Sequence, residues 1–487
     1  MKQVLFLVFS LAACLSTSAQ WIQIGQDLNG DSQQDILGTA VSISADGNIV
    51  ATSAPQSDIG SQNSGLVRVF QLQGSTWTQL GQDIVGVTGD QLGYSLSLNS
   101  IGNRIVVGAE FADGAGVNSG KAMVYELQND NWVQIGQTIE GLFADDRLGK
   151  SVKMNSQGNK IIVGTPNFVD QGLLAGRAQI FELQGSSWIQ VGDDLIGDIS
   201  GGSFGYAVDM NSSGNIVIVG ARGEINLNAQ GYLRVYEYNG SNWMLKGQEL
   251  TGVEMGDRFG YSVVVNDGGT LLAHGSPAAN QFFGRARIYG LENNVWTQIG
   301  SDITGSEDNI FFGVDIDFNE SNNLLAVSSW GDSSSNGRIN FYNINNNDWI
   351  DLDEPIIGGF GLGFFGESME LSSSGKKIVS GTSGSMSSTG RTEMFENDNI
   401  LGVNNLSLTD ESTILFPNPS DESFVLKFPK AQEKLQVYIY DSNGRRVYQK
   451  KYNDLDCVEI THSLPSGIYF VQTINKGMTA TKKLLVF

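Results

Sequence analysis

The sequence predicts an all-β protein built as a seven-bladed β-propeller. The first observation is a signature of Leu or Phe, then Gly, any residue, a Ser, Ala or Asp, and an apolar residue. It recurs at Gly38, Gly93, Gly149, Gly205, Gly260, Gly313 and Gly366. The second is a tryptophan of the same period, at Trp21, Trp77, Trp132, Trp188, Trp243, Trp296 and Trp349. Both markers step by 53–56 residues, so seven copies account for residues 20–396.

Composition is the third observation. The 487 residues include 61 Gly and only 8 Pro, and helical patterns are scarce. This balance is typical of many short strands joined by tight turns. Length alone would suggest about three domains, but a fixed repeat takes precedence over that expectation.

The N-terminus, residues 1–19, is interpreted as an export signal. A basic residue precedes an apolar run, and small polar residues lead to Ala19-Gln20, where cleavage is expected. An alternative is a lipobox at Leu11–Cys14, which would leave a lipoprotein anchored at Cys14. On the first interpretation only Cys457 survives cleavage, so no internal disulfide forms. No later stretch reaches the roughly 20 apolar residues of a transmembrane helix.

Each copy contains four short runs with strand character. In the first copy these are Gly38–Ile43, Ile49–Ala54, Leu66–Leu72 and Trp77–Leu80. The third run alternates apolar and polar residues, and the second is more uniformly apolar, which suits a strand covered on both faces. A turn pair such as Asp46-Gly47 separates the first two runs and favours an antiparallel hairpin. Four antiparallel strands repeated seven times describe propeller blades.

The ends of the repeat predict how the ring closes. Trp21–Gly25 is a fourth strand with no preceding three, while the last copy stops at Arg391–Glu396 without a Trp strand. We therefore expect the N-terminal strand to complete the final blade, which removes an exposed sheet edge. The recurrent tryptophans are interpreted as packing between neighbouring blades rather than as a sugar-stacking surface.

Charge excludes one class of partner. The formal net charge is -23, and residues 413–487 carry ten Lys/Arg against seven Asp/Glu, so -26 falls on residues 1–412. Such an acidic surface repels phosphate backbones, so no nucleic acid is expected as a partner. Cations, basic proteins and neutral polymers stay open.

Few residues are suited to catalysis. Nucleophilic catalysis needs a base beside Ser or Cys, and the only histidines are His274, in a second strand, and His462, near the C-terminus. A His/Cys metal site is excluded by these numbers. Paired carboxylates for glycoside hydrolysis stay possible because acidic residues are abundant.

Two sets of loop aspartates form the candidate ligand site. One set lies three residues before the signature glycine, and the other lies between second and third strands. In a propeller both loop types emerge on the same face, so these groups would form an acidic rim around the axis. The simpler alternative is that they accept N–H bonds within turns. The residues are Asp35, Asp58, Asp90, Asp113, Asp146, Asp170 and Asp257.

The repeat resembles the FG-GAP family, the blades of the integrin α-subunit propeller and its bacterial relatives. Phe204-Gly205 and Phe259-Gly260 match the first half of that motif, and Gly108-Ala109 and Gly220-Ala221 approach the second. Members that bind calcium use Asp-rich loops between the first two strands, and here those loops are two-residue turns. No cofactor or metal is therefore predicted; a bound calcium ion stays an open alternative that no Asp-rich loop motif supports.

The C-terminal segment, residues 413–487, follows a polar stretch, 397–412, that is interpreted as a linker. It contains, in order, Phe416–Pro419, Val437–Val447, Leu464–Val471 and Lys482–Phe487. This ordered set resembles the C-terminal sorting domain of type IX secretion substrates. The resemblance implies a small Ig-like β-sandwich, a partnership with the type IX secretion machinery, and an extracellular or cell-surface location.

The function predicted from these parts is a secreted or surface-displayed binding or adhesion propeller without catalysis. Its ligand would be an extracellular glycan or protein. Two alternatives are a polysaccharide-acting enzyme that uses carboxylates on the acidic rim, and a structural component of a surface layer.

Overall fold

The computed structural model describes residues 21–223, 229–306, 310–319, 323–331, 336–345, 348–352, 355–359, 364–384, 389–397, 414–416, 420, 423–432, 435–441, 445–452, 455–475 and 478–486. The expected signal segment and lipobox lie outside these residues, as does the linker apart from Asn397. The chain forms two compact units, Met1–Ile400 and Leu401–Phe487. Every regular element in the described part is a β-strand, and no helix there is long and apolar enough to span a bilayer.

Seven four-stranded antiparallel sheets make up the first unit, so the prediction of a seven-bladed propeller is confirmed. The strands nearest the axis are β3 (Val41–Ile43), β8 (Ser95–Leu98), β13 (Ser151–Met154), β20 (Phe204–Met210), β25 (Ser262–Val265), β29 (Ile316–Asn319) and β34 (Phe365–Leu371). The second strands are β4 (Ile49–Ala54), β9 (Arg104–Ala109), β14 (Lys160–Thr165), β21 (Ile216–Ala221), β26 (Leu271–Ser276), β30 (Leu324–Ser329) and β35 (Lys377–Thr382).

The outer half of each blade also follows the repeat. The third strands are β5 (Leu66–Gln73), β10 (Lys121–Gln128), β17 (Arg177–Gln184), β22 (Tyr232–Tyr238), β27 (Arg285–Glu292), β31 (Arg338–Asn345) and β36 (Arg391–Glu396). The fourth strands are β6 (Thr76–Gln79), β11 (Asn131–Gln134), β18 (Ser187–Gln190), β23 (Trp243–Leu245), β28 (Val295–Thr304), β32 (Asp348–Asp351) and β1 (Ile22–Gln23). Short continuations pair with the third strands, at β2 (Leu28–Asn29), β7 (Ile84–Val85), β12 (Ile139–Glu140), β19 (Leu195–Ile196), β24 (Leu250–Thr251) and β33 (Ile356–Ile357). An extra hairpin joins β15 (Val169–Asp170) to β16 (Leu173–Leu174).

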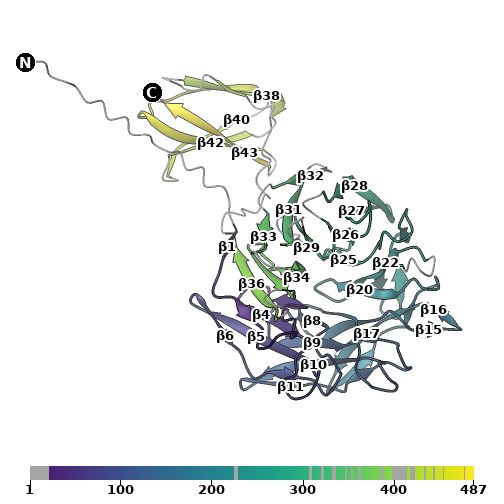
Figure 1. Ribbon diagram of the computed structural model, residues 1–487. Helices are drawn as coiled ribbons and strands as arrows, with labels where there is room; N and C mark the ends of the chain where they lie inside the picture. The colour runs from purple at the N-terminus through teal and green to yellow at the C-terminus, as the bar shows by residue number, and fades with distance from the viewer. Residues whose placement is uncertain are drawn as a thin grey trace, which may run out of the picture. The chain divides into compact units, whose positions relative to one another are not determined.

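The N-terminal strand belongs to the seventh blade. β1 pairs with β36, β2 pairs with the other end of the same strand, and the Ile24 amide donates to the Met394 carbonyl at 2.9 Å. Trp21 is buried against Phe341, with ring centroids 4.5 Å apart. Figure 1 shows the purple first blade beside the green last blade. The two ends of the ring are thus joined through a shared sheet.

The tryptophans join neighbouring blades. The Trp188 indole N–H donates to the Ile135 carbonyl of the preceding blade at 3.0 Å, and Trp77, Trp132, Trp243, Trp296 and Trp349 make the same bond at 2.8–3.0 Å. A side chain on Gly136, which has φ +73°, would place its Cβ 2.5 Å from Trp188 Cδ1. In six of the seven copies a glycine four residues after the tryptophan makes room in this way for the next indole: Gly25, Gly81, Gly136, Gly192, Gly247 and Gly300.

The second unit is a small β-sandwich, as expected from its sequence. One sheet has the order β37 (Ile414–Phe416), β38 (Ser423–Gln432), β41 (Leu455–Thr461). The other has the order β40 (Arg446–Tyr452), β39 (Leu435–Asp441), β42 (Gly467–Asn475), β43 (Met478–Val486). Buried apolar side chains from both sheets, such as Phe424 and Val437, form one core. Pro417–Pro419, which opens the expected motif set, lies outside the described residues.

Candidate functional site

A cavity of about 260 Å³ lies on the propeller axis and is lined by inner strands and turns of all seven blades. It opens on the side of the turns between first and second strands, which we call the turn face. The opposite side carries the longer loops and is called the loop face. A smaller cavity of about 160 Å³ shares Lys153, Asp209, Asp317 and Glu370 with the first and reaches Asp315.

The charged groups of the cavity occupy one position of the repeat. The fourth residue after each signature glycine is Ser42, Ser97, Lys153, Asp209, Val264, Asp317 and Glu370. In five blades its side chain accepts a hydrogen bond from a backbone N–H of the next inner strand. The distances are 3.0 Å (Leu98 to Ser42), 3.2 Å (Met154 to Ser97), 2.9 Å (Val265 to Asp209), 2.6 Å (Leu371 to Asp317) and 2.8 Å (Ile43 to Glu370). Side chains at this position therefore link one blade to the next around the axis.

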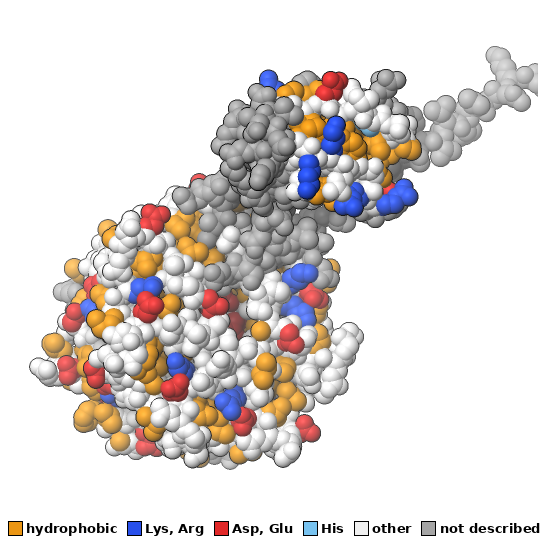
Figure 2. All heavy atoms as spheres, turned by 180° about the vertical axis from the view of Figure 1, so that it is seen from behind, with side chains coloured by type: hydrophobic (Ala, Val, Ile, Leu, Met, Phe, Trp, Pro, Cys, Tyr) orange, Lys and Arg blue, Asp and Glu red, His pale blue; other side chains and the backbone are white. Residues whose placement is uncertain are grey.

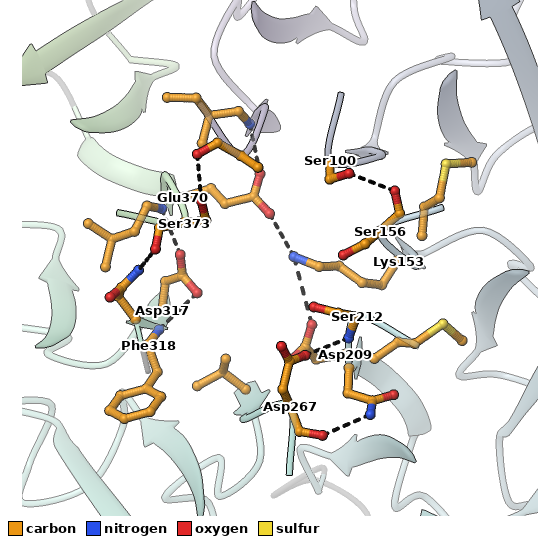
Figure 3. Close-up of a pocket in the computed structure, with 18 of the residues that line it drawn as sticks. Ser100, Lys153, Ser156, Asp209, Ser212, Asp267, Asp317, Phe318, Glu370 and Ser373 are labelled. Carbon is orange, nitrogen blue, oxygen red and sulfur yellow. Dashed lines mark hydrogen bonds and ion pairs between the residues drawn. The ribbon is translucent and has the colours of Figure 1, made fainter. Parts of the chain in front are cut away.

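Lys153 is the exception that supplies positive charge. Its Nζ lies 2.7 Å from Glu370 Oε1 and 3.7 Å from Asp209 Oδ1. Figure 3 shows the ammonium group between these two carboxylates, with Asp317 on the Glu370 side. Burial alone would lower the pKa of Lys153, but attraction to Glu370, Asp209 and Asp317 raises it, so this lysine stays charged.

Two aspartates in the sixth blade resist ionisation. Burial raises the pKa of Asp315 to about 7 and that of Asp317 to about 6, although each accepts backbone N–H bonds. Because both values lie above those of the unfolded chain, the stability that these groups contribute is fully present below about pH 4. It is lost as the pH rises through 6 and 7.

The seven predicted rim aspartates are all described, and none of them lines the axial cavities. Asp35, Asp90, Asp146 and Asp257 are buried, and Asp58 and Asp113 are exposed. Turn bonds occupy several of them: Asp146 Oδ2 accepts N–H bonds from Leu142 and Phe143 at 3.0 and 2.9 Å. Asp58 and Asp113 each accept the amide of the fifth residue onward, at 2.8 and 2.9 Å. Asp170 lies in the β15–β16 hairpin. These contacts hold loops in shape.

The sequence reasoning overlooked the axial residues Lys153, Asp209, Asp315, Asp317 and Glu370. The sequence did contain a signal for most of them. The position four residues after the signature glycine holds a small, basic, acidic or apolar residue depending on the copy, although its neighbours are similar in all seven copies. No group of three or more His, Cys, Asp or Glu side chains in the described part is arranged to hold a metal ion.

His274 is a core residue. It is fully buried on β26, its ring centroid lies 3.8 Å from that of Phe259, and its Nε2 has no hydrogen-bond partner among the described residues. Burial lowers the pKa of His274 to about 3, and repulsion by Arg287 and Arg285 acts in the same direction.

Replacing His274 with valine, the residue of several other copies, should stabilise the protein selectively in acid. The stability contributed by the neutral ring is present above pH 6.5 and is lost as the pH falls toward 3. The free energy of unfolding of His274→Val minus that of the parent should therefore be about 2–3 kcal/mol larger at pH 4.5 than at pH 8. Urea unfolding at both pH values measures this difference, and an equal effect at the two would contradict the assignment.

The loop face carries a row of four aromatic rings from blades five to seven. Phe282, Phe311, Trp330 and Phe364 follow one another with centroid separations of 5.5 Å. Phe282 and Phe364 are 54% and 46% exposed, and the Trp330 indole N–H has no hydrogen-bond partner among the described residues. We call this set the aromatic row.

A second group on the loop face comes from blades two to five. Lys150 Nζ lies 3.9 Å from the Tyr94 ring centroid and 5.0 Å from that of Tyr206, which in turn lies 5.1 Å from the Tyr261 ring. Tyr94, Lys150, Tyr206 and Tyr261 each directly follow a signature glycine. Variable residues at one position of the repeat are thus brought side by side.

The two units differ in charge. Figure 2 shows blue side chains gathered on the C-terminal unit, whereas the propeller displays red and blue side chains intermixed with polar surface. This matches the excess of basic residues in 413–487.

The comparisons with known proteins describe the two units separately. No curated protein matches the chain in sequence. Among solved structures, Sqt1 from Chaetomium thermophilum is similar with 16% identity and a TM-score of 0.47, over 82% of this chain and 97% of that one. The β-propeller domain of the Trilobed protease from Pyrococcus furiosus is similar with 13% identity and a TM-score of 0.42, over 74% and 94%. Residues 414–487 match the secretion system C-terminal sorting domain. The sorting domain implies that the type IX secretion machinery handles the chain and exports it to the cell surface or the extracellular space.

Proposed function

We propose that the exported protein is a binding or adhesion propeller, without catalytic activity, that recognises an extracellular ligand on its loop face. The main observation in support is a contrast around the signature glycine: some positions hold the same type of residue in all seven copies, and others differ from copy to copy. The signature glycine and the apolar residue before it are constant in character because both pack against the preceding blade, as Gly205 does against Thr165 and Arg177. Two flanking positions are not constrained in this way.

The first variable position lies two residues before the signature glycine. It is occupied by Ile36, Gln91, Arg147, Ser203, Arg258, Phe311 and Phe364. The first six adopt φ between 50° and 59°, a left-handed conformation that costs a side-chain-bearing residue about 1 kcal/mol or more. Keeping bulky, chemically different side chains in a strained conformation supports a role in presenting them to a ligand.

The second variable position directly follows the glycine and holds Thr39, Tyr94, Lys150, Tyr206, Tyr261, Val314 and Glu367. Tyrosine, which stands at three of these seven positions, is enriched where proteins bind partners. The resemblance of the blades to FG-GAP repeats of integrin α-subunits agrees with a role in adhesion.

The test is a glycan array and a whole-cell pull-down with the mature full chain and two matched variants. Phe282→Ser/Phe364→Ser alters the exposed ends of the aromatic row, and Ile101→Ser alters an equally apolar residue, 66% exposed, on the turn face. We expect the double variant to lose at least tenfold in retention while Ile101→Ser binds as the parent does. Equal binding by all three proteins would contradict recognition by the loop face.

A second candidate is a polysaccharide-acting enzyme, favoured by the two axial carboxyl groups of raised pKa, Asp315 and Asp317. This candidate predicts that the protein releases product from a glycan panel and that Asp317→Asn, or the rim changes Asp113→Asn and Asp146→Asn, abolish this activity.

A structural role in a surface layer instead predicts that no soluble ligand binds saturably. Calcium is tested by thermal shift, where a raised Tm would indicate a bound ion.

A further inference from the structure

The loop face of blades two to five concentrates positive charge in an otherwise acidic unit. Besides Lys150, three arginines lie over aromatic rings: Arg147 over Phe111 at 4.8 Å, Arg222 over Tyr206 at 4.3 Å, and Arg258 over Tyr261 at 5.9 Å. The centroids of the Tyr94 and Phe111 rings are 5.9 Å apart, so the Arg147–Phe111 pair adjoins the Lys150–Tyr94 pair. We call this set the basic arc: Tyr94, Phe111, Arg147, Lys150, Tyr206, Arg222, Arg258 and Tyr261.

Among the described residues, two carboxylates face the basic arc and leave it with an excess of positive charge. Glu110 is buried, 3.3 Å from Lys150 Nζ and 3.8 Å from Arg147 Nη1, and Glu367 interacts with Lys150 and accepts a bond from Ser383. Four cations against these two carboxylates give a formal +2, whereas residues 1–412 carry -26. The Arg147 Nε is buried without a hydrogen-bond partner among the described residues.

The positive field has a measurable consequence for Tyr206. Burial alone would raise the pKa of its phenol, but Lys150 and Arg222 lower it overall. The Lys150 ammonium and the Arg222 guanidinium that lower the pKa of Tyr206 also attract an anionic group from outside, and guanidinium groups bind carboxylate and sulfate oxygens through paired N–H donors.

We propose that the basic arc binds the carboxylate or sulfate groups of an acidic extracellular polysaccharide. The inference rests on the proposed function, because it specifies the ligand of the same face. A polysaccharide is favoured over an acidic protein because blade five contributes both Arg258 to the basic arc and Phe282 to the aromatic row. An extended chain can place its acidic groups on the arc and the apolar faces of its sugar rings on the exposed phenyl groups. The strongly acidic remainder of the propeller repels a polyanion, which confines binding to this part of the surface.

The probes are polygalacturonate, dextran sulfate, neutral dextran and poly-glutamate, titrated calorimetrically into the mature full chain at 50 and 300 mM NaCl. We expect the two acidic polysaccharides to bind, more weakly at the higher salt, and neutral dextran not to bind. Binding of poly-glutamate as tight as that of polygalacturonate would overturn the polysaccharide assignment and indicate an acidic protein as partner.

Arg147→Gln/Arg258→Gln should weaken polygalacturonate binding at least tenfold. The matched control, Arg104→Gln/Lys160→Gln, removes the same charge from the turn-face ends of β9 and β14 and should leave binding unchanged. If the first double variant does not fold, Arg222→Gln is tested in its place. Equal loss in test and control variants would show only a general charge effect and overturn the site. Failure of both acidic polysaccharides to bind, with retention in the array still sensitive to Phe282→Ser/Phe364→Ser, would overturn this inference and leave the proposed function standing.

Discussion

Replacing Lys153 with methionine should destabilise the propeller by about 2–4 kcal/mol at pH 8, because a half-buried, hydrogen-bonded ion pair loses one partner. The substitution keeps the length of the side chain but removes the ammonium group from between Glu370 and Asp209. The remaining carboxylates, with Asp317, would then repel one another on the axis. Urea unfolding followed by tryptophan fluorescence measures the loss.

The effect should depend on pH in a defined direction. As the pH falls to 5, Asp315 and Asp317 take up protons because their pKa values are raised to about 7 and about 6, so the penalty should shrink to less than half of its value at pH 8. Lys160→Met is the control within the same blade, since Lys160 Nζ lies 3.9 Å from a Glu182 carboxylate that is 32% exposed, and this longer ion pair should contribute less than about 1 kcal/mol. A penalty that is equal at pH 5 and pH 8 would show that packing, not charge, is what Lys153 supplies.

Deleting Trp21–Gly30 should cost at least about 5 kcal/mol and leave the ring prone to association. The deletion removes β1, β2 and the buried Trp21, and truncating one buried tryptophan alone typically costs about 3–5 kcal/mol. It also exposes the unpaired edge of β36. Thermal unfolding and light scattering of the shortened mature chain measure both consequences.

Two further measurements isolate the role of the N-terminal segment, residues 21–30, in closing the ring. Ile22→Ala changes an exposed side chain on β1 while keeping its backbone bonds, and should shift stability by no more than about 0.5 kcal/mol. A synthetic peptide of residues 21–30 supplied to the shortened chain should restore the Tm by pairing with β36. A shortened chain as stable as the parent would mean that other contacts hold the ring closed.

Such contacts exist at the turn face. The Ala45 amide donates to the Ser100 carbonyl at 2.8 Å, Ser100 to Ser156 and Ser156 to Ser212 at 3.1 Å, and Ser373 donates back to Ala45 at 3.0 Å. This belt crosses from the last blade to the first without involving β1. The loss of stability on deletion therefore measures how much of the ring closure depends on the pairing of β1 and β2 with β36. Whatever stability remains is supplied by the hydrogen bonds between the turns.

Much of the fold was predictable because one unit is repeated seven times. The two-residue turn, the signature glycine at the start of the first strand and the tryptophan of the fourth strand each have the same role in nearly every copy. Their recurrence is therefore visible in the sequence. The candidate functional site was harder to predict from the sequence. The Asp residues that recur, such as Asp146, recur because they hold turns, whereas Lys150 and Lys153 each occur once and stand out only against the equivalent positions of other blades.

The sequence by itself determined the number of blades, the all-β class and the sorting domain, because periodicity and ordered motifs are local properties of the chain. Only the tertiary structure decided which charges meet. Lys153 and Glu370 are separated by 217 residues yet form a 2.7 Å ion pair, and Tyr94, Lys150, Tyr206 and Tyr261 adjoin only because the ring turns successive copies toward a common axis. Closing a repeated sheet around an axis places equivalent positions from different blades side by side, and their combined charge is a property of that closure rather than of any one copy.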